Sequence, residues 1–304
     1  WIEISPGTAV NAAGVSDLGS GASASVDVDN TAPEVTISST ASNPTRNTPI
    51  PVTIIFSEDV TGMASGDLIV TNGSVSGFTV LSATTYKADI VPGAQGTVTV
   101  RVSGNAGFDA VGNGNPPAQL ERVYDSVMPE VVIARTSGTN DPTRTLPVAF
   151  NITFSEPVTG FTLGDIVFSG TATGLVTSLS GSGMSYTVQV LSASTDGTIV
   201  ADVPGNVALD AAGNTNNAAS GGANTVTLDR TAPSVTLNQA AGQADPTSIL
   251  PILFSVEFNE PVTGFGVSDI TIVSGTGVSM TVTGSGTSYE IAVTSANDGV
   301  ITLA

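Results

Sequence analysis

The sequence predicts an all-β protein made of tandem β-sandwich domains in a rod-like array. A seven-residue phrase recurs in residues 56–62, 154–160 and 258–264, at intervals of about one hundred residues, the size of one small β domain. Apolar and polar side chains alternate along short stretches between turn residues, and no stretch has the apolar spacing of a helix. The chain also contains 34 Gly and only 5% aromatic residues, which is typical of short strands joined by small-residue turns.

The recurring phrase reads Phe-Ser-Glu-Asp-Val-Thr-Gly in the first copy, Phe-Ser-Glu-Pro-Val-Thr-Gly in the second and Phe-Asn-Glu-Pro-Val-Thr-Gly in the third. Each copy supplies one Glu, and an Asp follows that Glu nine residues later. The Glu residues are Glu58, Glu156 and Glu260, and the Asp residues are Asp67, Asp165 and Asp269. We expect each of these Asp residues to cap a loop rather than to bind a ligand.

A second phrase marks where each repeat begins. Asp29, Asp125 and Asp229 each stand four residues before a Pro and open an alternating apolar stretch. These positions divide the chain into four parts. Residues 1–29 are the C-terminal part of one repeat, 30–125 and 126–229 are whole repeats, and 230–304 is the N-terminal part of another repeat.

The incomplete repeat is divided inside a strand. The matching strands of the two whole repeats run on into a Gly-Asn loop, whereas the third copy begins at Gly299 and stops at Ala304. Its continuation resembles the segment that starts at Trp1, which makes Trp1 a candidate core residue at the joint. Asn11 then stands where the second repeat has Asp210.

Two explanations of this division remain open. The chain is a window cut from a longer polypeptide, or the N-terminal strands of one subunit complete the C-terminal domain of the next by strand addition. In both cases the expected partners are adjoining repeats or further copies of the chain, head to tail, with residues equivalent to 1–29 completing residues 230–304.

Period-two alternation places the strands within each repeat. In the first repeat, strands are expected around 35–37, 52–56, 86–90 and 98–102, and the later repeats preserve the pattern. One face of each strand is apolar, as in two antiparallel sheets that bury a shared interior. About seven strands per repeat predict an immunoglobulin-like sandwich rather than a barrel or a β-helix. Three tyrosines are in phase with core positions and are expected to pack there: Tyr86, Tyr186 and Tyr289.

Composition and charge exclude several function classes. The chain has 26 acidic and 7 basic residues, and a net charge of −19 is opposite to the charge that binds nucleic acid. No apolar run approaches the roughly 20 residues of a membrane helix, so no membrane contact is expected within this segment. No His and no Cys is present, which removes the usual nucleophile and base combinations. Carboxylate pairs such as Glu58 and Asp67 recur in every repeat, so they favour architecture over glycoside hydrolysis, and we expect no enzymatic activity.

Three motifs in fixed order resemble a known family. They are Phe-Ser-Glu-Pro-Val-Thr-Gly-Phe at 154–161, Asp-Ala-Ala-Gly-Asn at 210–214 and Asp-Arg-Thr-Ala-Pro at 229–233. Together they resemble the bacterial immunoglobulin-like repeats of large surface adhesins and biofilm-associated proteins, and the resemblance covers essentially the whole chain. It implies an extracellular or bacterial cell-surface location, a rod-like extender or filament module and, in many relatives, calcium near the domain junctions. It implies no enzymatic activity.

Sandwich topology predicts which residues meet at each junction. The loop between the second and third strands and the loop before the last strand both lie at the pole where a domain starts, beside the incoming linker. The candidate calcium ligands are therefore Asp29, Glu58 and Asp109 at the first junction; Asp125, Glu156 and Asp210, with Asn43, at the second; and Asp229, Glu260 and Asp141 at the third, where Asn11 replaces Asp210 if the ends join.

Calcium binds six to eight oxygens, several of them from carboxylates, and such a junction supplies them. Like charges this close repel without a cation, so calcium would stiffen the linker and its removal would loosen it. The alternative is that these Asp residues only hydrogen-bond their own turns.

Two functions remain, and they belong to different classes. The first is a structural extender or filament-forming segment of a bacterial surface protein, whose role is mechanical reach. The second is an adhesive module that binds a glycan or a cell-surface protein through its loops or elsewhere in the full protein. Recognition usually breaks repeat symmetry with an aromatic cluster or a long loop, and this sequence has neither, so the structural function is favoured.

Overall fold

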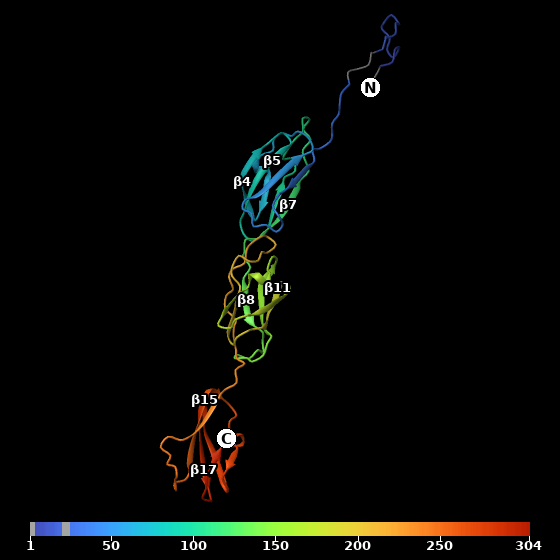
Figure 1. The fold of residues 1–304 in the computed structure, drawn as a ribbon. Helices are drawn as coiled ribbons and strands as arrows, with labels where there is room; N and C mark the ends of the chain where they lie inside the picture. Colours follow the sequence, from blue (N-terminus) through green and yellow to red (C-terminus); the bar gives the residue numbers. More distant parts are fainter. Residues whose placement is uncertain (1–3, 20–24) are drawn as a thin grey trace.

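The computed structural model describes residues 4–19 and 25–304. Three β-sandwiches follow one another along the molecule, and an N-terminal segment precedes them (Figure 1). The N-terminal segment and the third sandwich lie at opposite ends (Figure 1). The proposed core role of Trp1 falls outside the described residues.

The first sandwich has seven strands in two antiparallel sheets. One sheet has the order β1-β2-β5-β4 and the other β3-β6-β7. This four-plus-three arrangement is that of a constant-type immunoglobulin sandwich, so the fold class expected from the sequence is confirmed. The strands are β1 (Val35–Ser38), β2 (Ile50–Phe56), β3 (Leu68–Thr71), β4 (Gly73–Val80), β5 (Thr85–Pro92), β6 (Gly96–Val102) and β7 (Ala118–Tyr124).

The second sandwich repeats this plan with one difference. Its sheets have the orders β11-β9-β8 and β10-β12-β13. A single 17-residue strand, β11, covers the stretch that β4 and β5 cover in the first sandwich, and its register against β9 shifts between Gly183 and Ser185. The strands are β8 (Val131–Arg135), β9 (Val148–Val158), β10 (Val167–Gly170), β11 (Val176–Ser192), β12 (Gly197–Asp202) and β13 (Thr225–Leu228).

The third sandwich has one complete sheet and one narrow sheet. Strands β14-β15-β17 form the first, and β16-β18 form the second. In the described chain, no strand occupies the place next to β18 that β7 and β13 take in the other two sandwiches. The strands are β14 (Val235–Gln239), β15 (Ile252–Val262), β16 (Ile272–Ser274), β17 (Val278–Ser295) and β18 (Thr302–Leu303).

Alternating apolar residues of both sheets form each core. In β2, Ile50, Val52, Ile54 and Phe56 all point inward and are buried, which is the period-two pattern of the sequence. The first and second cores contain 15 and 19 buried residues, whereas the third contains 5. The third core is therefore the least complete of the three.

The aromatic residues behave as the sequence predicts. Tyr86, Tyr186 and Tyr289 are buried and pack edge-to-face against Phe56, Phe154 and Phe258, with ring centroids 5.7, 6.0 and 5.9 Å apart. Their packing role is confirmed.

A single 3₁₀ turn follows the recurring phrase in each repeat: η1 (Ser65–Asp67), η2 (Leu163–Asp165) and η3 (Val267–Asp269). The last Asp of each turn accepts the backbone N–H at its start, at 2.9 Å for Ala64, 2.7 Å for Thr162 and 2.8 Å for Gly266. The expected loop caps are therefore confirmed. In the described part of the chain, none of the helices has the length and apolarity needed to cross a membrane.

Candidate junction sites

The loop between the last two strands of a sandwich is organised around one buried Asp. In the first sandwich, Asp109 Oδ1 accepts the backbone N–H groups of Val111, Gly112 and Asn113 at 2.9, 2.6 and 2.8 Å. Oδ2 accepts the side-chain amide of Asn113 at 2.8 Å. Burial acts to raise the pKa of Asp109, but these hydrogen bonds outweigh it and hold that pKa below its ordinary value.

The second sandwich builds the same loop around Asp210. Its two carboxylate oxygens accept the backbone N–H and the side-chain amide of Asn214, both at 2.8 Å. The amides of Asn113 and Asn214 also donate to the carbonyls of Asp29 and Asp125, at 3.2 and 3.0 Å. This Asn therefore fastens the loop to the incoming linker in both repeats.

The recurring phrase brings its Glu to the same linker. Ser57 donates its N–H to the Glu34 carbonyl at 2.9 Å, and Glu34 donates its N–H to Ser57 Oγ at 3.0 Å. Ser155 and Glu130 make the same pair of bonds at 2.9 and 3.0 Å. Because Glu58 and Glu156 directly follow these serines, their side chains are delivered to the start of each domain.

The structure gathers two of the three predicted sets. Asp29, Glu58 and Asp109 each offer a carboxylate oxygen within 4.8 Å of the others, and so do Asp125, Glu156 and Asp210. Calcium binds oxygens at 2.3–2.6 Å, so ligands on opposite sides of the ion are about 5 Å apart. The spacing and the all-carboxylate donor set fit that ion.

In the second set, the neighbouring carboxylates affect the pKa of Glu156. Partial burial raises the pKa of Glu156, and the neighbouring charges of Asp210 and then Asp125 raise it further. Both carboxylate oxygens of Asp210 also accept hydrogen bonds from Asn214, so this loop has protein partners of its own.

The third set is not gathered among the residues that the structure describes. Asp141 pairs with Arg135 instead, and its Oδ1 accepts the Thr227 N–H at 2.9 Å. The Thr227 N–H and the Arg135 guanidinium hold the pKa of Asp141 below its ordinary value. Asp141 therefore ties its loop to the last strand of its own sandwich, and the expectation that it joins Asp229 and Glu260 is corrected.

In the first sandwich, Asn43 likewise ties its loop to the last strand of its own domain. Its Oδ1 accepts the Val123 N–H at 2.8 Å. In both the Asn-Pro-Thr and the Asp-Pro-Thr turn, the side chain before the Pro therefore accepts a hydrogen bond from its own domain.

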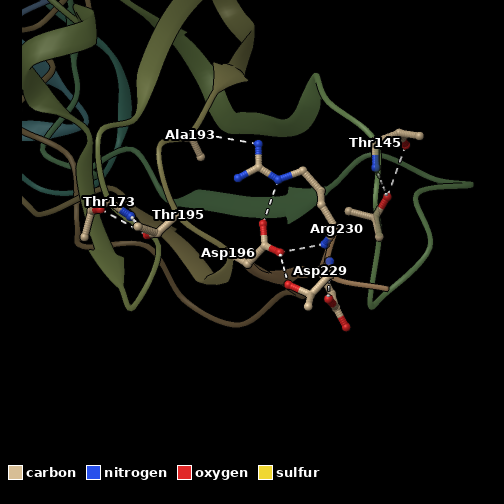
Figure 2. Close-up of polar contacts among 9 residues, drawn as sticks. Thr145, Thr173, Ala193, Thr195, Asp196, Asp229 and Arg230 are labelled. Atoms are coloured by element: carbon tan, nitrogen blue, oxygen red, sulfur yellow. Dashed lines mark hydrogen bonds and ion pairs between the residues drawn. The ribbon is translucent and has the colours of Figure 1, made fainter. Parts of the chain in front are cut away.

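Sequence reasoning missed the contacts that hold the linker to the preceding sandwich. At the second junction, Gln95 and Ser126 exchange two hydrogen bonds at 2.6 and 3.1 Å. At the third, Asp196 accepts the Arg230 N–H, its Nε and the Thr231 hydroxyl at 2.7, 2.6 and 3.1 Å, and Arg230 also donates to the Ala193 carbonyl (Figure 2). The two pairs lie at equivalent positions of their junctions but differ in residue type. The sequence therefore contains no repeated residue from which these contacts could be predicted.

Comparison with known proteins decides the family. Residues 29–123 and 125–227, more than half of the chain, match the family model described as the bacterial Ig-like domain. The chain belongs to the bacterial Ig-like domain family. Tandem bacterial Ig-like domains support a surface role as an extender or adhesin and point to a structural or adhesive protein rather than an enzyme.

Other comparisons add little to this family assignment. No curated protein matches this chain. A solved structure of FdeC, an adhesin of Escherichia coli, is similar over 90% of this chain and 91% of its own, with 15% sequence identity and a TM-score of 0.41.

Proposed function

We propose that this chain is a structural extender of a bacterial cell-surface protein, a length of rod whose junctions bind calcium and hold consecutive Ig-like domains in line. One observation carries the proposal. At two junctions, the linker carboxylate of Asp29 or Asp125 lies within 4.8 Å of two carboxylates from the following domain.

Such an ion would connect the linker, which is held by the preceding sandwich, to the following sandwich. At the second junction, the Asp125 N–H donates to the Thr45 carbonyl of the preceding sandwich at 2.9 Å, and Ser126 is held by Gln95 of that sandwich. The Asp125 carboxylate faces Glu156 and Asp210 of the following sandwich. A cation bound by all three would therefore restrict how far the linker bends.

Removal of the ion would leave repulsion in its place. Three carboxylates within 4.8 Å of one another disfavour the folded junction unless a cation or a proton offsets their charge. Burial is the largest cause of the raised pKa of Glu156, and the repulsion from Asp210 and Asp125 adds to it.

The surface charge suits this role. The net charge of −19 keeps neighbouring rods apart and gives a solvated surface. Head-to-tail continuation with further repeats or copies, outside the cell, would extend the rod, and length is the property that such a protein supplies.

Chelation tests the calcium part of the proposal. In excess chelator we expect a lower melting temperature and a smaller maximum dimension in small-angle scattering, because the junctions then bend. Calcium should reverse both changes, and the variant Glu156→Gln should respond less than the parent chain. Glu121→Gln removes the same charge from an exposed strand position outside both clusters and serves as the matched control. A melting curve and scattering profile that ignore chelator would contradict the calcium sites while leaving the rod itself in place.

A further inference from the structure

One arginine of the first sandwich lies at the second junction. Arg46 ends the Asn-Pro-Thr-Arg turn between β1 and β2. Its neighbour Thr45 donates an N–H to the Val123 carbonyl, and the Thr45 carbonyl accepts the Asp125 N–H, both at 2.9 Å. Asp125 is the linker residue of the carboxylate cluster, so these bonds hold the turn of Arg46 beside the linker side of that cluster.

The side chain of Arg46 reaches the following sandwich. Its Nε lies 4.0 Å from the point where a Cβ on Gly213 would stand. Gly213 belongs to the loop that is organised by the hydrogen bonds between Asp210 and Asn214. The guanidinium of the first sandwich therefore lies against the loop that carries a carboxylate of the cluster.

The same loop is covered from outside the core of its own sandwich. Ala212 is 8% exposed, yet it is not one of the residues that form the second core. Arg46 reaches the next residue, Gly213, so the end of the first sandwich contributes to this cover. The second junction is therefore a contact between two sandwiches as well as a linker.

Arg46 carries an unpaired charge in a protein that has few positive charges. The chain has 7 basic residues against 26 acidic ones. Arg135 and Arg230 form ion pairs, whereas the guanidinium of Arg46 makes no ion pair or hydrogen bond with the residues that the structure describes. A guanidinium is not deprotonated in proteins, so its charge is permanent. A permanent cation therefore lies at the edge of a cluster of three carboxylates.

We propose that Arg46 is the built-in counter-ion of the second junction. Its guanidinium offsets part of the negative charge of Asp125, Glu156 and Asp210, and it thereby holds the two sandwiches together when no metal ion is bound. This inference deepens the proposed function, on which its calcium part rests, by stating what sets the calcium affinity of that site.

Charge balance gives Arg46 two opposite effects. The three carboxylates carry three negative charges, of which one calcium ion offsets two and one guanidinium offsets the third. Without calcium, the guanidinium reduces the repulsion among the carboxylates. With calcium, the guanidinium and the ion repel each other, so Arg46 lowers the affinity of the junction for calcium. An uncharged residue in the same place would have neither effect.

Calcium titration tests the effect on affinity. The full chain carrying Glu58→Gln serves as the parent, because this change removes a carboxylate from the first cluster and the titration then reports mainly on the second. Adding Arg46→Gln should make calcium bind at least about threefold more tightly, because a charge that repels the ion is lost. Arg46→Lys keeps that charge and should stay close to the parent. Lys87→Gln removes one positive charge from an exposed position of β5 and is the matched control, with no change expected.

Interdomain distances without calcium test the effect on the contact. Spin labels on Thr79→Cys and Ser169→Cys, one exposed position in each sandwich, report the range of angles between the first and second sandwiches. In excess chelator at low salt, Arg46→Gln should give a broader distance distribution than the parent, whereas Lys87→Gln should not. In about 1 M salt this difference should disappear, because the Debye length is then only about 3 Å. Arg46 is exposed, so its variants should keep the fold of the parent.

The two measurements distinguish failure of this inference from failure of the proposed function. A calcium affinity that is unchanged or weaker in Arg46→Gln would overturn the inference and leave the calcium junctions standing. Distributions that are equally broad with and without Arg46 in chelator, or a difference that persists in high salt, would also overturn it. A chain that binds no calcium, yet broadens in chelator when Arg46 is lost, would contradict the calcium sites and support Arg46 as the counter-ion of the junction.

Discussion

Each residue of the recurring phrase has its own structural role. In the second repeat, Phe154 and Val158 are buried in the core, Ser155 closes a pair of hydrogen bonds with Glu130, and Gly160 adopts a φ of 83°, a conformation that favours glycine. Glu156 is the residue of the phrase whose side chain lies with Asp125 and Asp210 in the candidate junction site. Neighbouring residues of the phrase therefore meet separate local requirements of the fold and of the junction.

For single residues, the sequence predicted which residues lie at the junctions better than it predicted which side chains contact one another. Repetition indicated that Glu58 and Glu156 matter, and sandwich topology indicated that an Asp from a distant loop would meet each of them. The pairing of Asp141 with Arg135, six residues earlier in the chain, could not be predicted, because it depends on the direction in which the two side chains point and leaves no periodic signal in the sequence. The repeated motifs correctly predicted that Asp125, Glu156 and Asp210 lie together. They predicted the third set in the same way, and only the structure shows that Asp141 does not join it among the described residues.

Glu156 gives a prediction about pH. A carboxyl whose pKa is raised in the fold holds its proton more tightly folded than unfolded, so stability falls as pH rises from its ordinary value of 4.5 towards its raised value. Without calcium, Glu156→Gln should remove this loss and raise the stability of the second domain at pH 7 by about 1 kcal/mol or less, after solvent screening.

Thermal unfolding of Glu156→Gln and of the parent, in chelator at pH 4 and pH 7, checks this. The difference between the two proteins should be larger at pH 7 than at pH 4. A variant that is less stable than the parent at pH 7 in chelator would show that Glu156 makes a favourable contact there rather than a repulsive one.

Among the elements, the strands were the most predictable and the loops the least. Period-two alternation located β2 and β6 because one face of each strand is buried and the other is not. The same pattern could not show that β11 is one strand where the first sandwich has two, since that depends on backbone pairing across the bulge near Gly183. Loop roles depend on hydrogen bonds between residues that carry no periodic signal.

The loop after β12 shows how much stability a loop residue can supply. Asn216 is fully buried, and its Oδ1 accepts the N–H groups of Val207 and Ala208, both at 2.9 Å. Its amide donates to the carbonyls of Pro204 and Asn217 at 3.0 and 2.6 Å. Asn216→Ala should therefore destabilise the second domain by about 2–4 kcal/mol, because buried backbone groups lose their partners.

Chemical denaturation of Asn216→Ala measures this loss. Ser220→Ala, an exposed change in the same loop, should be close to neutral. If the two variants are equally stable, water must satisfy the groups that Asn216 leaves, and the loop would not depend on this side chain.

Across the whole molecule, the repeat organisation was predictable and the junction contacts were not. The intervals between Asp29, Asp125 and Asp229 indicated a linear array, and the three sandwiches do follow one another along the molecule (Figure 1). Gln95 with Ser126, and Asp196 with Arg230, differ in residue type at the same place, so only three-dimensional contact identifies them as equivalent.

The junction between the second and third sandwiches gives the last prediction. Asp196 holds both the backbone N–H and the guanidinium of Arg230, and these bonds, the backbone one foremost, keep the pKa of Asp196 below its ordinary value of 3.8 (Figure 2). Arg230→Ala should change the melting temperature little, because exposed ion pairs contribute little to stability. It should nevertheless broaden the range of angles between the two sandwiches, because the linker loses a contact to the preceding domain.

Spin labels on Ser169→Cys and Glu290→Cys, one exposed position in each sandwich, measure that range as an interdomain distance distribution. Arg144→Ala, which removes an exposed arginine of the same pole that has no ion pair among the described residues, is the matched control and should leave the distribution narrow. The carboxylate form of Asp196 is the one that the fold stabilises, so its contribution is present at neutral pH and is lost only as pH falls below 3.8 through its lowered pKa. A distribution equally broad in the parent and in Arg230→Ala at neutral pH would show that the ion pair does not set the angle, and that the backbone bonds of Asp229 and Arg230 hold the linker alone.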